Sequence, residues 1–164
     1  MAMIVLTTEI DAPMTRVFDL ARSIDLHTDS TAKTRERAVA GVTAGLIGAG
    51  DEVTWRARHF GVWLSLTVRV ETFEPPVHFS DAMLRGAFRS MVHHHHFAPS
   101  PNGTIMRDEF EFHSPFGVLG RVVDVLILRP YLRSLLVERN RIVKATAESD
   151  DWRKYLKTAS ADSP

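Results

Sequence analysis

The residues best suited to chemistry in this sequence are four consecutive histidines in the middle of the chain, His93 to His96. They lie in a segment with the pattern of a β-strand, so we expect His93 and His95 on one face and His94 and His96 on the other. Residues two apart on a strand lie about 6.5–7 Å apart at Cα, which allows two imidazoles to converge on one zinc ion. We favour the face of His93 and His95. A register error of one residue would exchange the two faces, so the face of His94 and His96 stays open.

A metal site needs a third ligand, and His59 and Asp108 are the candidates on faces expected to point inward. Neither stands at a spacing typical of a metal motif. The simpler expectation is that the histidines form part of a half-polar cavity wall or lie in solvent. We therefore expect no cofactor and no metal, with His93 and His95 as weak candidates for a metal site.

Asp108 stands between Met106 and Phe110, on the otherwise apolar face of an alternating segment. A carboxylate there must pair with a charge, accept hydrogen bonds or become protonated. It can orient a histidine as an acid–base couple, or it can form a structural hydrogen bond to a neighbouring strand. The pattern favours the structural role, and His59 and Asp108 remain the catalytic candidates.

The elements that must position these residues are predicted from periodicity and turn residues. A strand over residues 3–10 precedes two short helices, which end near residue 30. Further strands are expected over 35–40, 52–60, 62–73, 78–84, 87–97 and 104–113, with a glycine-rich loop over 41–50. A long helix follows Gly117, and Pro130 inside it is expected to cause a kink.

Only the long helix is large enough to cover the apolar faces of these strands. We therefore expect an α+β fold in which a curved antiparallel sheet of about seven strands wraps around the C-terminal helix. Residues 1–157 form one domain and residues 158–164 a frayed tail.

A cavity between sheet and helix is the default ligand site. The expected ligand contacts are Trp55, His59, His93, His95, Phe97, Met106, Asp108, Phe110 and Leu126. The basic residues of the late helix, Arg139 among them, are expected on its solvated face.

Several segments carry a family resemblance from Thr8 to about Ala147. They are Ile10–Pro13, Gly50–Trp55, His59–Gly61, Phe79–Met83, Gly86–Phe88 and Ser114–Gly120. With the layout above, they resemble the START-like or SRPBCC superfamily, which includes polyketide cyclase/dehydrase, lipid-transfer and pollen-allergen-like proteins. The resemblance implies a helix-grip fold with a hydrophobic cavity. It implies no single reaction, because carriers, receptors and enzymes share this fold.

The amino-acid composition excludes several classes of function for this chain. The chain has 164 residues, 45% of them hydrophobic, with 20 basic and 20 acidic side chains. These values are ordinary for one globular domain, and the balanced charge argues against a general nucleic-acid binder. The absence of cysteine excludes disulfides, thiolate nucleophiles and cysteine-ligated metals. The N-terminus lacks the features of a signal peptide and no apolar stretch is long enough for a membrane span, so we expect a cytoplasmic protein.

The expected function is binding of a small hydrophobic or amphipathic ligand, lipid-like or polyketide-like, in the cavity. A rival hypothesis is a cyclase or dehydratase in which a histidine acts as general base and Asp108 orients it. A histidine-based metal site and a protein-interaction module are two further hypotheses. The sequence leaves open whether the protein is an enzyme, and a homodimer is possible.

Overall fold

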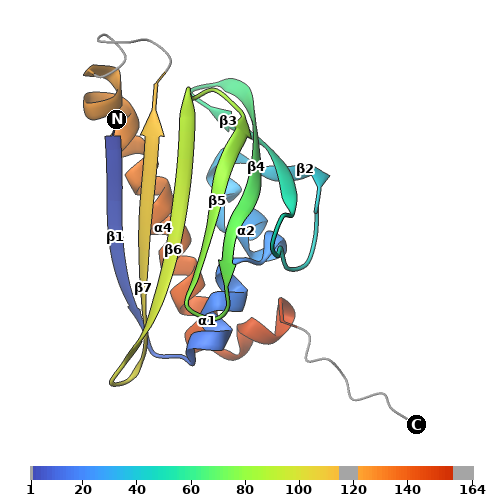
Figure 1. Ribbon diagram of the computed structural model, residues 1–164, viewed down its shortest axis with the longest axis vertical. Helices are drawn as coiled ribbons and strands as arrows, with labels where there is room; N and C mark the ends of the chain where they lie inside the picture. Colours follow the sequence, from blue (N-terminus) through green and yellow to red (C-terminus); the bar gives the residue numbers. More distant parts are fainter. Residues whose placement is uncertain (1, 115–121, 157–164) are drawn as a thin grey trace.

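The computed structural model describes residues 2–114 and 122–156. Its centre is one antiparallel sheet with the strand order β1-β7-β6-β5-β4-β3-β2, which curves in front of the C-terminal helix α4 (Figure 1). The strands are β1 (Ala2–Ile10), β2 (Arg37–Gly41), β3 (Glu52–His59), β4 (Val62–Glu74), β5 (His78–Arg85), β6 (Ser90–Ser100) and β7 (Gly103–His113). The first and last strands pair with each other at one side of the sheet, so residues distant in sequence lie next to each other there.

Two short helices follow β1, as the sequence predicted, and a longer helix ends the fold. The helical segments are α1 (Met14–Ala21), α2 (Ile24–Ser30), η1 (Ala32–Thr34), η2 (Asp124–Leu128), α4 (Arg129–Glu148) and η3 (Asp150–Lys154). Helix α4 packs against β1, α1 and α2. The predicted α+β helix-grip architecture is therefore confirmed. The predicted start of the long helix near Gly117 and the frayed tail lie outside the described residues.

Three boundaries differ from the prediction for local reasons. Strand β2 does not begin at Arg35, because this residue has a left-handed backbone (φ 53°) that closes η1 and is incompatible with a strand. Strand β6 begins at Ser90 rather than at Ala87 and runs to Ser100. Pro130 lies in the first turn of α4, directly after the π-helical turn η2. The irregularity that proline introduces is thus taken up by a local change in helical hydrogen bonding.

The inner face of the sheet is filled at one end and hollow at the other. At the filled end, α1 packs on β6 and β7, and Phe18 of α1 contacts the rings of Phe79 and Phe97 at 5.5 and 5.3 Å between centroids. Met106 belongs to the same buried cluster and is fully buried. Beyond this cluster the inner face continues toward β3 and β4, and α4 lies over it. That part carries the cavity.

Candidate functional site

A cavity of about 440 Å³ lies between the sheet and α4. This volume is in the range of pockets that hold drug-sized molecules. Its wall is mostly apolar, and the apolar side chains include Ile47, Val53, Trp55, Leu66, Val68, Phe79, Met91, Phe110, Leu132 and Leu136. Those on the sheet come from β3, β4, β5, β6 and β7, because the alternation of each strand turns every second side chain inward.

Five of the predicted ligand contacts line this cavity. They are Trp55, His59, His93, His95 and Phe110. His93 and His95 share the inner, buried face of β6 with Met91 and Phe97, which is the face favoured from the sequence.

Four predicted contacts lie elsewhere. Phe97 and Met106 are on the expected face, but their positions along the strands place them under α1, in the filled part of the core. Leu126 belongs to η2 and is 69% exposed, since the π-helical turn directs it away from the sheet. Asp108 is fully buried behind the two histidines and does not line the cavity itself.

Asp108 is the centre of a buried polar cluster. Nε2 of His93 lies 3.1 Å from Oδ1 of Asp108, in hydrogen-bond geometry. Nδ1 of His95 lies 2.8 Å from the same oxygen, but at an angle too poor for a directed hydrogen bond. The amide of Asn140 donates to Oδ2 at 2.7 Å. The carboxylate thus holds both cavity-lining histidines from behind.

Two further charged groups complete the cluster. Oδ1 of Asp81 lies 3.5 Å from Nε2 of His95, so this imidazole stands between two carboxylates. Arg139 donates from Nη2 to the carbonyl of Ala21 at 2.8 Å. Its Nη1 lies 3.7 Å from Asp108 and has no hydrogen-bond partner among the described residues. Both Asp81 and Arg139 line the cavity.

The two imidazoles differ in their affinity for a proton. Burial, and after it the adjacent His95, lower the pKa of His93 to about 4 against the opposing effect of Asp108. Burial also disfavours the charged form of His95, but Asp108 and Asp81 outweigh burial and raise its pKa. The rings are 3.8 Å apart between centroids, so two charges there would repel. A proton that enters the cluster is therefore held on His95 in preference to His93.

The charge of Asp108 also fixes the tautomer of His93. Burial raises the pKa of Asp108, but the contacts with His93 and His95 outweigh burial and hold it well below its usual range. An ionised carboxylate only accepts hydrogen bonds, so Nε2 of His93 must carry the proton that it shares with Asp108. In the neutral ring, Nδ1 is then the unprotonated nitrogen.

His59 is not part of this cluster. Its Nδ1 lies 2.9 Å from the hydroxyl of Tyr131 on α4. The predicted couple between His59 and Asp108 is therefore not formed. A second polar pair on the wall joins Nε2 of His27 to Glu36 at 3.3 Å, and the ring of His27 packs on Trp55. Burial raises the pKa of Glu36, but the hydrogen bond from His27 and the charges of His27, His59 and Arg139 together outweigh burial and leave the pKa lowered.

Sequence reasoning missed Asp81, Arg139 and the pair of His27 with Glu36. A signal existed for two of them. Asp81 is two residues from Phe79, and so it shares that residue's inner face. Arg139 lies three residues after Leu136 and four before Val143, in register with the apolar stripe of the helix. The expectation that Arg139 is solvated is wrong, since it is only 7% exposed.

A family model described as polyketide cyclase / dehydrase and lipid transport matches residues 1–148. The chain belongs to this family. The SRPBCC-type resemblance seen in the sequence is thereby confirmed. A comparison with curated proteins finds no match.

Solved structures of low sequence identity share the fold of this family member. TTHA0849 from Thermus thermophilus is 18% identical, with a TM-score of 0.69 over 89% of this chain and 99% of that chain. The major latex-like protein 151 from Panax ginseng is 13% identical, with a TM-score of 0.66 over 90% and 98%. Protein Ms6760 from Mycobacterium smegmatis is 14% identical, with a TM-score of 0.63 over 87% and 88%. At these identities the likeness shows the fold alone.

None of the helices in residues 2–114 and 122–156 combines the length and the hydropathy that a membrane-spanning segment needs. In this family member, the longest helical segment instead supplies one wall of the cavity.

The burial of His93 should make the stability of this family member depend on pH. Its pKa of about 4 in the folded chain lies below the ordinary 6.5, so the unfolded chain binds a proton first as the pH falls. This effect lowers the free energy of unfolding between pH 6.5 and 4, by about 3 kcal/mol in total. His93→Gln keeps an N–H for Asp108 but removes the titration. We expect its stability to fall less over this interval than that of the wild type.

Urea unfolding at several pH values, with a chelator present to exclude metal ions, measures this difference. The control is His113→Gln, which removes a half-exposed imidazole that bonds to Ser90. The control should follow the wild-type pH dependence. Parallel pH curves for His93→Gln and the wild type would contradict a buried neutral His93.

Proposed function

We propose that the cavity binds a small hydrophobic or amphipathic molecule, lipid-like or polyketide-like, and releases it reversibly. The observation that carries the proposal is a largely apolar cavity with one charged cluster set into its wall. Apolar walls favour an apolar ligand body through burial, at about 25 cal/mol per Å² before the costs of association. The description of the family, which names lipid transport, supports this proposal.

The polar cluster defines the other end of the ligand. Nη1 of Arg139 is a buried donor without a hydrogen-bond partner among the described residues, and its residue lines the cavity. A buried unsatisfied donor is costly, so a ligand that supplies an acceptor there gains affinity. The guanidinium is also positive, so it favours an oxygen that is negative or strongly polar. The proposed ligand therefore has a carbonyl or carboxylate oxygen on an apolar body.

A titration with 1-anilinonaphthalene-8-sulfonate tests the proposal, because this probe combines an apolar body with an anionic acceptor. We expect its fluorescence to rise and to saturate at one equivalent per folded chain. Dodecanoate should displace it, since both ligands need the same apolar wall and the same donor. Fluorescence that rises without saturation, or that dodecanoate leaves unchanged, would count against binding in the cavity.

The contact of His93 with Asp108 favours a second candidate function, acid–base catalysis of the cyclase or dehydratase type. Asp108 places the proton on Nε2, so Nδ1 of His93 is available to accept a proton from a carbon next to a carbonyl. Arg139 is placed to stabilise the charge that would develop on the oxygen.

Deuterium exchange into a 1,3-diketone, followed by NMR in heavy water, tests this second function. Catalysis by the wild type that His93→Gln abolishes, with binding of the fluorescent probe retained, would support a catalytic His93. If the diketone exchanges no faster with the protein than in buffer, the result would count against catalysis and leave ligand binding as the proposed function. The cytoplasmic location and the homodimer inferred from the sequence stay predictions.

A further inference from the structure

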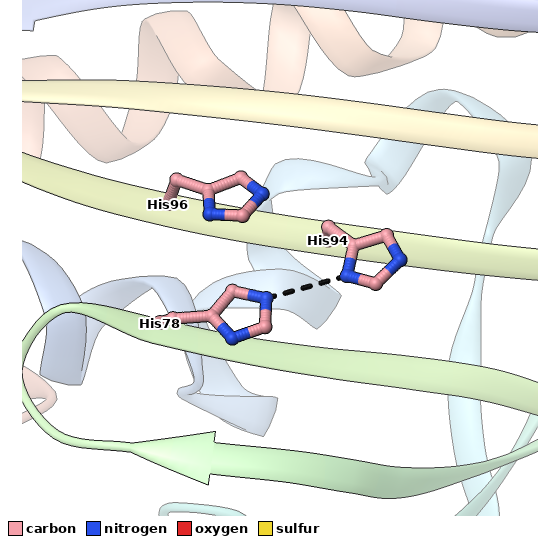
Figure 2. A group of neighbouring side chains, drawn as sticks. All are labelled: His78, His94 and His96. Carbon is pink, nitrogen blue, oxygen red and sulfur yellow. Dashed lines mark hydrogen bonds between the residues drawn. The ribbon is translucent and has the colours of Figure 1, made fainter.

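The outer face of the sheet carries three histidines that the cavity does not use. His78 begins β5, and His94 and His96 lie on β6. His78 pairs directly with His96 across the two strands, and His94 is its diagonal neighbour. All three side chains are half-buried, and Figure 2 shows the three rings gathered over these two strands. We call this group the outer histidine cluster.

The spacing of the outer histidine cluster fits a metal ion. One ring nitrogen from each residue lies within 4.8 Å of the others. Nε2 of His78 and Nδ1 of His94 are 3.3 Å apart, joined by the dashed line in Figure 2. Two imidazole nitrogens on a tetrahedral zinc ion are also about 3.3 Å apart, given Zn–N bonds of about 2.05 Å. The rings are nearly parallel, at 13° to 16°. Coordination of one ion therefore requires these half-buried rings to rotate until their nitrogens point at it.

The charges around the outer histidine cluster also favour a cation. Glu74 of β4 stands opposite His78. On β7, Glu109 stands opposite His94 and Arg107 opposite His96. Arg107 forms an ion pair with Glu109, so the three neighbours together carry one net negative charge.

The cavity offers a competing trio, Asp81, His93 and His95, whose ligand atoms are similarly close. Its imidazoles are already engaged by Asp108. The guanidinium of Arg139 lines the same part of the wall. A divalent cation there would compete with Asp108 for both imidazoles and would lie beside the positive guanidinium of Arg139. Coordination is therefore less favourable there than at the outer histidine cluster.

We propose that His78, His94 and His96 form a surface site for one divalent transition-metal ion of the zinc class. Three imidazoles with no protein carboxylate are a donor set that suits zinc, nickel and copper rather than magnesium or calcium. The fourth coordination position faces outward and is open to water. The ion cross-links β5 to β6 on the face opposite the cavity, which makes this site independent of ligand binding.

Calorimetric titration with zinc chloride tests the site on chain without a purification tag, after dialysis against a chelator. We expect one equivalent to bind, and we expect His78→Gln, His94→Gln and His96→Gln each to weaken binding about tenfold or more. His113→Gln, a histidine of the same sheet outside the cluster, is the matched control and should keep the wild-type affinity. Zinc should also raise the urea midpoint of the wild type and leave that of His94→Gln unchanged, because only a site in the folded state stabilises the chain.

Two results would overturn the proposal. One is the absence of binding heat up to about 1 mM zinc, far above the range of a three-ligand site. The other is zinc binding that survives His94→Gln and is lost in His93→Gln, which would place the ion in the cavity. Each variant is first unfolded in urea without metal, so that loss of the fold is not mistaken for loss of the site.

Discussion

Asp108→Ala is expected to lower the free energy of unfolding by about 3–5 kcal/mol, the largest effect of any single substitution proposed for this chain. The carboxylate is fully buried and is shared by His93, His95 and Asn140. Its removal leaves the buried His95 ring and the Arg139 guanidinium without their shared anion. Since a domain of this size is stable by about 5–15 kcal/mol, the variant loses about a fifth or more of its stability.

Urea unfolding at pH 7 measures this loss. Asp108→Asn retains the shape and an acceptor oxygen, and we expect it to cost less than the alanine variant, about 1–3 kcal/mol. Glu109→Ala is the matched control, because Glu109 is the next residue on β7 and pairs with Arg107 on the outer face. Such a surface pair contributes about 1 kcal/mol at most. Equal losses for Asp108→Ala and Glu109→Ala would contradict the central role of the buried carboxylate.

Leu66→Trp is expected to weaken binding of 1-anilinonaphthalene-8-sulfonate about 30-fold or more, equal to about 2 kcal/mol. Leu66 lines the cavity and stands opposite Trp55 in the pairing of β3 with β4. A second indole beside Trp55 occupies volume that the probe needs. The side chain is half-buried at the edge of empty space, so the larger ring enters the cavity with little strain on the fold.

The same fluorescence titration compares Leu66→Trp with Leu84→Trp. Leu84 lies on β5, is 39% exposed and does not line the cavity. This control introduces the same indole outside the cavity, and it should retain the wild-type affinity. If both variants bind the probe as the wild type does, the probe occupies some other surface and the cavity account fails.

The inner face of the sheet was predictable because alternation alone determines it. Burial follows period two along β6 and β7, and so the sequence placed His93, His95 and Asp108 on the inner face. The same pattern could not tell which part of that face is hollow. Phe97 is only two residues from His95, yet α1 covers it, and the position of α1 depends on contacts between distant segments.

The missing members of the cluster depended on how separate elements meet. Asp81 reaches His95 through the register of β5 against β6, in which Asp81 stands opposite His93. Arg139 reaches Asp108 because α4 is rotated to turn a charged residue toward the sheet. A basic helix segment predicts a solvated face on average, and only a buried carboxylate reverses this preference. The prediction that Leu126 contacts the ligand is wrong for a similar reason. The π-helical turn before Pro130 changes the direction in which the side chains of this segment point.

The central claim is that the space between sheet and α4 receives an apolar ligand, and methyl NMR tests it most directly. Spectra of leucine and valine methyl groups are recorded during titration with 1-anilinonaphthalene-8-sulfonate. The account predicts saturable shifts for Leu66, Val68, Leu132 and Leu136, which line the cavity, and none for the exposed Leu84. Shifts confined to Leu84 and other exposed methyl groups, or no saturable shift at all, would contradict it.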